Sequence, residues 1–227
     1  MHQAFWLFIT FLVAACSLLY ELILAQVLSA LLGGTVLRYV TTIGCYLFAM
    51  GVGSIIAERF HHKSKESFFR IELLLTLLGL TGPILLLWVH SVAGDAVVVK
   101  TIFFYFWVLL IGVLTGLEIP LIVAMAKNNR VQYSTVLAMD YVGSFFGCLF
   151  FPWVLLPMWG LLQGSGLVAF INLMVSFFLW IFLKKGKDDL QVHWMELGGM
   201  VLLGLTALAI FFSSPDFEMK VLNLYGK

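Results

Sequence analysis

The 227-residue chain is 62% hydrophobic and only 11% charged, with a formal net charge of +1. An average soluble domain is about 45–50% apolar and about 25% charged, so this composition excludes a soluble globular protein and predicts that most of the chain is surrounded by lipid. A net charge so close to zero also excludes a general attraction to nucleic acid, and we expect no nucleic-acid partner.

Seven apolar stretches are long enough to cross a bilayer as helices, which takes about 20 residues. They cover residues 5–28, 39–57, 71–90, 101–125, 136–156, 161–183 and 194–212. None alternates with the period of two expected of a strand, and helices satisfy every backbone hydrogen bond in lipid. The sequence therefore predicts an all-α, polytopic transmembrane helix bundle of about seven spans over residues 1–213, followed by a short extramembrane tail over 214–227.

The first stretch is interpreted as a membrane helix and not as a cleaved signal peptide, because no Lys or Arg precedes it and no small-residue cleavage site ends it. The N-terminus and the loops after the second, fourth and sixth stretches together hold nine Lys and Arg residues, and the opposite side holds four. Basic residues gather on the cytoplasmic side. We therefore expect a multi-pass protein of the cell (inner) membrane, with a cytoplasmic N-terminus and an external C-terminus.

Three carboxylates lie well inside the predicted helices: Glu21, Glu118 and Asp140. Since no Lys or Arg lies at comparable depth, these groups are either protonated, or face a water-filled cavity, or hold a cation. The functional interpretation is a pocket that handles protons or cations such as amines, with Tyr20 and Gln26 beside Glu21 as further contacts. The alternative is three neutral carboxylic acids that hydrogen-bond to neighbouring helices.

Small residues spaced as GxxxG occur in two of the predicted helices: Gly112, Gly116, Gly143 and Gly147. Such spacing lets helix backbones approach closely, so these glycines predict packing and not activity. Because they adjoin Glu118 and Asp140, we expect the fourth and fifth stretches to pack together and bring the two acids close.

Other polar residues have simpler interpretations. Glu72 and Glu196 lie near predicted helix ends, where a carboxylate is favoured by the helix dipole. The chain has no glycine-rich nucleotide turn, no GxSxG, no HExxH and no cysteine cluster. We therefore assign no catalytic residue, no metal site and no cofactor.

Four segments together resemble the membrane-embedded N-terminal region of bacterial spermidine synthase-like proteins, which are polyamine aminopropyltransferases. The segments are ACSLLYELILAQVLSALLGGTVLRY (15–39), TIGCYLFAMGVGS (42–54), GLEIPL (116–121) and DYVGSFFGCLFFPWVLLP (140–157). In that family a multi-helix membrane region precedes a soluble aminopropyltransferase domain. We expect the chain to lack that domain, so no catalytic residue of the family carries over and enzyme activity by the chain alone is not expected.

The residues and the resemblance lead to three hypotheses. The first is an integral membrane subunit that binds or passes a polyamine or similar cation, with a soluble aminopropyltransferase-like protein, another membrane subunit or a second copy of itself as partner. The second is a structural membrane anchor or assembly subunit whose acids are packed and neutral. The third is a small transporter unrelated to polyamines, which would have to dimerise.

Overall fold

The computed structural model describes residues 2–94, 96–126, 131–185 and 194–212, and this part of the chain is helical without a strand. Its α-helices are α1 (His2–Leu32), α2 (Thr35–Ile56), α3 (Ser64–Val92), α4 (Val97–Ala126), α5 (Tyr133–Phe150), α6 (Leu156–Lys185) and α7 (Trp194–Phe211). A 3₁₀-helix, η1 (Ala57–Lys63), joins α2 to α3, and one π-helical turn, η3 (Phe151–Leu155), lies between α5 and α6. The predicted all-α fold class is confirmed.

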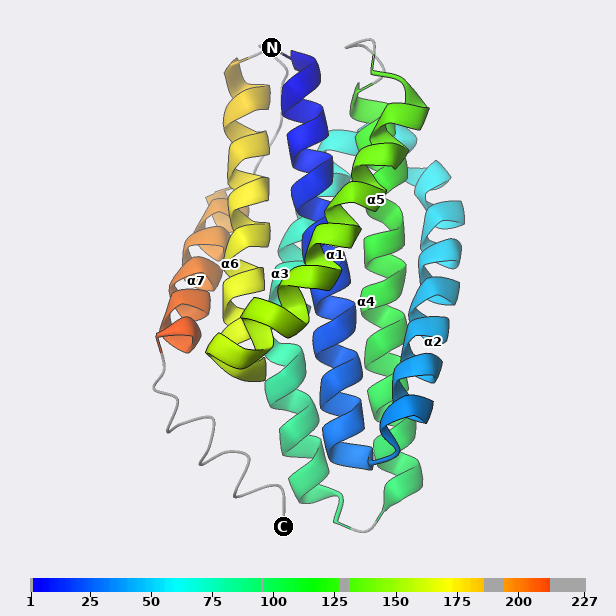
Figure 1. Ribbon diagram of the computed structural model, residues 1–227. Helices are drawn as coiled ribbons and strands as arrows, with labels where there is room; N and C mark the ends of the chain where they lie inside the picture. The colour runs from blue at the N-terminus through cyan, green and yellow to red at the C-terminus, as the bar shows by residue number, and fades with distance from the viewer. Residues whose placement is uncertain (1, 95, 127–130, 186–193, 213–227) are drawn as a thin grey trace.

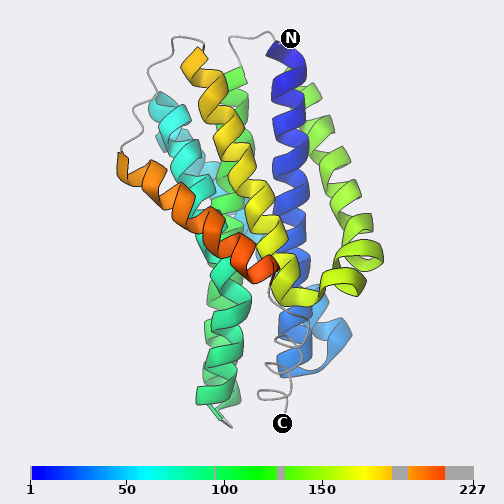
Figure 2. The same ribbon diagram turned by 90° about the vertical axis from the view of Figure 1, so that its left-hand side faces the viewer.

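The helices form an elongated bundle with α1 at its centre (Figure 1). α1 packs against α2, α3, α4, α5 and α6, which explains why many of its apolar residues are buried. The start of α1 lies at the same end of the bundle as the end of α2, the end of α4 and the end of α6 (Figure 1). α7 crosses the outside of α6 and α3 obliquely (Figure 2).

Five stretches of the described chain are long and apolar enough to cross a membrane, judged by length and composition. They are Gln3–Leu32, Thr35–Phe60, Ser64–Val92, Val97–Ala126 and Tyr133–Phe182. The last contains two helices, because the backbone leaves helical geometry at Gly160, with φ 68° and ψ −160°, and α6 runs back in the direction opposite to α5, on the other side of α1 (Figure 1). The apolar part of α7, Glu196–Phe211, is shorter than these stretches. The number of about seven spans therefore stays a prediction, as does the external C-terminus, since residues 213–227 lie outside the described part.

Gly112 and Gly116 place the backbone of α4 against that of α2. A methyl group added at Gly116 would lie 2.1 Å from the carbonyl oxygen of Met50, and one at Gly112 would lie 2.8 Å from Cβ of Ala49. Only a residue without a side chain fits at such distances. The α4 glycines therefore serve contact with α2.

Gly143 and Gly147 place the backbone of α5 against that of α1. A methyl group at Gly143 would lie 2.3 Å from the carbonyl oxygen of Phe11, and one at Gly147 would lie 3.0 Å from that of Ala15. The expectation that these glycines join the fourth and fifth helices was wrong: α4 and α5 make little contact, and each packs through its glycines on a different neighbour. The GxxxG spacing marks a face for close approach but does not specify the partner.

Candidate functional site

A cavity of about 250 Å³ lies between α1, α2, α4 and α5, and the three predicted acids Glu21, Glu118 and Asp140 all line it. They come from α1, α4 and α5, so the acids converge although α4 and α5 hardly touch. Among the described residues no Lys, Arg or His lines this cavity. The structure thus gathers three acidic groups around one space without a basic partner.

The cavity is deep on one side and open on the other. The side chains of Glu118 and Glu21 are only 2% and 4% exposed. In contrast, Leu47 of α2 and Tyr141 of α5, which also line the cavity, are 57% and 66% exposed. α2 and α5 make almost no contact with each other, so direct helix packing does not close the cavity there. A ligand could enter between these two helices and reach the buried acids.

Glu118 is held by a short hydrogen bond from α1. Ser17 Oγ donates to Glu118 Oε2 at 2.6 Å, and the hydroxyl of Tyr46 on α2 donates to the carbonyl oxygen of Ser17 at 3.0 Å. The other carboxyl oxygen, Glu118 Oε1, is buried and has no hydrogen-bond partner in the described part of the chain. An unpaired buried polar atom is costly, which marks this oxygen as available to a ligand or a proton.

Glu72 is a buried acid that the sequence interpretation placed near a helix end and left out of the site. Its side chain is 0% exposed, and it interacts electrostatically with the carboxyl of Glu118, although neither of its oxygens has a partner of normal hydrogen-bond geometry among the described residues. Asn172 of α6 holds the backbone nearby, donating from Nδ2 to the carbonyl oxygen of Glu72 and to Oγ1 of Thr76, each at 3.3 Å. Glu72 does not line the cavity and lies behind Glu118.

The interpretation of Glu72 as a residue near a helix end was wrong for a definite reason. The predicted stretch began at residue 71, where strong hydropathy begins, but α3 begins at Ser64. Glu72 is therefore roughly two turns inside the helix. Phe68 and Phe69, both buried, are the signal in the preceding polar segment that could have extended the helix.

Tyr20 lies behind the cavity and not in it. Its side chain is 2% exposed, and its ring packs so closely on α3 that a methyl group at Gly79 would lie 2.1 Å from it. It interacts electrostatically with Glu72 and Glu118, and its hydroxyl has no hydrogen-bond partner in the described ranges. The structure therefore places Tyr20 near Glu72 and Glu118, away from the cavity.

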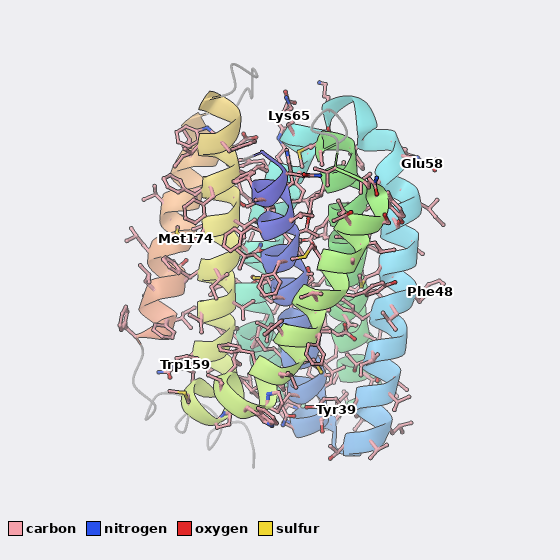
Figure 3. All side chains as sticks on the ribbon, turned by 45° about the horizontal axis from the view of Figure 1, so that its top comes forward. Tyr39, Phe48, Glu58, Lys65, Trp159 and Met174 are labelled. Carbon is pink, nitrogen blue, oxygen red and sulfur yellow. The ribbon has the colours of Figure 1, made fainter. Side chains whose placement is uncertain are left out.

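Gln26 does not join the other predicted residues. Five positions along a helix place it about 140° around α1 from Glu21, on another face. Its Oε1 accepts a hydrogen bond from the hydroxyl of Tyr39, which lies near the end of the bundle opposite Lys65 (Figure 3). The prediction that Gln26 belongs to the cation site is therefore corrected, because Gln26 does not line the cavity.

The acids also do not form a site for a metal ion. Within the described ranges, no group of three or more His, Cys, Asp or Glu side chains is arranged to hold one. Three carboxyls spread around the walls of a cavity suit a larger cation that carries its charge on more than one atom.

Comparison with known proteins relates the chain to polyamine aminopropyltransferases over most of its length. Polyamine aminopropyltransferase 1 of Streptomyces coelicolor is 32% identical over 218 residues, which cover 92% of this chain and 40% of the relative. Polyamine aminopropyltransferase 2 of the same organism is 34% identical over 228 residues, covering 96% and 41%. Polyamine aminopropyltransferase 2 of Ralstonia nicotianae is 36% identical over 180 residues, covering 76% and 34%.

The chain spans about two-fifths of the length of the Streptomyces relatives that it matches. No family model matches it, and no solved structure matches it.

Proposed function

We propose that this chain is a multi-pass membrane domain whose acid-lined cavity binds a polyamine or a similar organic cation. The observation that carries the proposal is the convergence of Glu21, Glu118 and Asp140 on one cavity with no basic residue among its described lining. The polyamine class is suggested by the name of the relatives, polyamine aminopropyltransferase.

The charges and shape of the cavity suit a linear polyamine. An ammonium group that leaves water needs both a counter-charge and hydrogen-bond acceptors, and carboxylates supply both. Between the acids, the cavity is lined by apolar side chains such as Leu18, Leu47 and Ile119, against which methylene groups can pack. Its volume of about 250 Å³ lies just below the roughly 300–1,000 Å³ of pockets for drug-sized ligands, which favours a slim molecule.

The surface of the bundle supports a position within a membrane. α2 turns a row of large apolar side chains outward, including Val40 (65% exposed), Phe48 (70%) and Ile55 (74%), and Phe48 projects from the bundle in Figure 3. A soluble protein rarely exposes so continuous an apolar face. With the excess of basic residues on the N-terminal side, we propose a cell-membrane protein with a cytoplasmic N-terminus.

The relatives also suggest a partner. These relatives are named polyamine aminopropyltransferases. We therefore propose that the cavity works together with a soluble aminopropyltransferase-like protein and supplies or senses its cation. A second membrane subunit or a second copy of the chain are the other candidate partners.

The proposal is tested by binding of radiolabelled spermidine to the purified full chain in lipid nanodiscs. Glu21→Gln, Glu118→Gln and Asp140→Asn each remove one charge from the cavity, and Glu58→Gln removes an exposed carboxylate from η1 (Figure 3) as the matched control. Loss of a charge-assisted hydrogen bond is worth about 1.5–3 kcal/mol, so we expect each cavity variant to bind at least about tenfold more weakly and the control to bind normally.

Two results would contradict the proposal. If the folded wild-type chain binds no spermidine, the acids are packed groups of a structural anchor. If all three cavity variants bind as well as the wild type, the cation site lies elsewhere. Where binding is found, uptake of spermidine into sealed vesicles separates a carrier from a binding subunit.

A further inference from the structure

Glu118 faces two different surroundings. On one side it lines the cavity with Glu21 and Asp140, and on the other it interacts with Glu72, which is completely enclosed. Its Oε2 accepts a hydrogen bond from Ser17, while its buried Oε1 has no hydrogen-bond partner within the described ranges. Glu72 and Glu118 form an inner carboxyl pair, and Glu118 is the one described acid that belongs both to this pair and to the cavity.

We propose that a proton and the organic cation compete for Glu118, which is protonated when the cavity is empty and ionised when a cation occupies it. Glu72 stays protonated throughout and acts as a positioning residue, donating a hydrogen bond to Glu118 Oε1 once Glu118 is ionised. This inference rests on the proposed function, because it concerns the same cavity.

The surroundings of the pair favour the neutral form when the cavity is empty. The titratable groups that face the two carboxyls are all acidic or weakly acidic: Cys16, Tyr20 and Glu21 from α1, Tyr46 from α2 and Asp140 from α5. α6 contributes the neutral amide of Asn172. No Lys, Arg or His in the described part of the chain faces them, so no positive charge stabilises two neighbouring carboxylates in a dry interior.

Glu72 can donate a hydrogen bond but cannot meet the cation. It is 0% exposed and does not line the cavity, and α1, α4 and α6 enclose it. A protonated carboxylic acid at this position is a hydrogen-bond donor. Together with the hydroxyl of Ser17, it would give the ionised Glu118 a donor for each of its two oxygens.

The exchange conserves charge. An ammonium group enters and pairs with the carboxylate of Glu118, and the proton of Glu118 leaves through the cavity to water. No other bond forms or breaks. At Glu118 itself, one ammonium charge takes the place of one proton, so this buried position avoids the cost of an unpaired charge.

The test is titration calorimetry of the full chain in nanodiscs with spermidine, in two buffers of different ionisation enthalpy. We expect the release of about one proton per cation bound by the wild type, and an affinity that rises about tenfold per pH unit while Glu118 is protonated in the empty state. In Glu118→Gln, we expect weaker binding without proton release. A proton lost by spermidine itself would still be released in that variant.

Two substitutions at Glu72 test its role as a donor. Glu72→Gln keeps a donor, so we expect affinity within about threefold of the wild type and an unchanged proton count. Glu72→Met has similar size without a donor, and we expect affinity at least about tenfold lower. A purely structural role would make the two variants alike. If Glu72→Met does not fold, the proton count and the pH dependence of binding by the wild type still decide whether a proton and the cation compete for Glu118.

The two proposals fail differently. Absence of spermidine binding by the folded wild type overturns the proposed function, and the proton competition with it. Binding without proton release, or release that persists in Glu118→Gln, overturns the competition alone and leaves the cation site intact.

Discussion

Ser17 Oγ on α1 donates a hydrogen bond of 2.6 Å to Glu118 Oε2 on α4, across 101 residues of sequence. The carbonyl oxygen of Ser17 in turn accepts a hydrogen bond from Tyr46 on α2. One small residue thus joins three helices at the wall of the cavity. It also fixes the orientation of the Glu118 carboxyl, with Oε2 occupied and Oε1 without a hydrogen-bond partner among the residues that the structure describes.

Ser17→Ala should weaken both the packing of these helices and the binding of a cation. A hydrogen bond to an ionised carboxylate is worth about 1.5–3 kcal/mol, so we expect spermidine affinity to fall at least about tenfold in the nanodisc assay. Ser165→Ala is the matched control, because Ser165 is also buried but its hydroxyl donates to the carbonyl oxygen of Leu162 in its own helix. Equal affinities of the two variants would show that Ser17 does not support Glu118.

Gly116→Ala should destabilise the bundle, because the added methyl group would lie 2.1 Å from the carbonyl oxygen of Met50. Overpacking of this kind costs about 1–3 kcal/mol, so the unfolding midpoint in detergent, followed by tryptophan fluorescence, should fall by several degrees. In Gly44→Ala no atom lies within 4 Å of the new methyl group. That control should unfold at the wild-type temperature or slightly above it. Equal midpoints would mean that α2 and α4 do not approach as closely as described.

Cysteine labelling tests the orientation. In a background without Cys16, Cys45 and Cys148, we introduce Lys63→Cys in η1 and Ala96→Cys between α3 and α4, which are exposed positions at opposite ends of the bundle (Figure 1). A membrane-impermeant maleimide added to intact cells, in a strain whose outer membrane passes the reagent, should label Ala96→Cys but label Lys63→Cys only after lysis. The reverse pattern would invert the orientation, and labelling of both from outside would contradict a membrane crossing by α3.

The ion pair between α3 and α7 should contribute little to stability. Nε of Arg70 lies 2.8 Å from Oε1 of Glu196, but the Arg70 side chain is 53% exposed. Exposed pairs contribute about 0–1 kcal/mol because water and salt screen them. A double-mutant cycle of Arg70→Ala and Glu196→Ala, measured by unfolding, should give a coupling energy below about 1 kcal/mol. A coupling above about 2 kcal/mol would show that this pair has a stronger role in holding α7.

Much of this protein is determined by local sequence. Hydropathy depends on neighbouring residues, so the all-α class could be predicted from the composition of each apolar run. The same reasoning made Glu21, Glu118 and Asp140 conspicuous, because a carboxylate inside an apolar run is costly and rare. These inferences needed no knowledge of which helix lies beside which.

The tertiary structure decided everything that depends on helix partners. Hydropathy does not reveal which helices are neighbours or which faces they turn toward one another. The sequence interpretation therefore placed Gln26 with Glu21, and it could not show that Glu72 lies against Glu118. The α4 glycines could equally have packed on α5, and they pack on α2 because side-chain shapes across the whole bundle must fit together. The cavity with its three acids exists only as a result of that packing, since its walls come from two pairs of helices, α1 with α2 and α4 with α5, which α3 separates in the sequence.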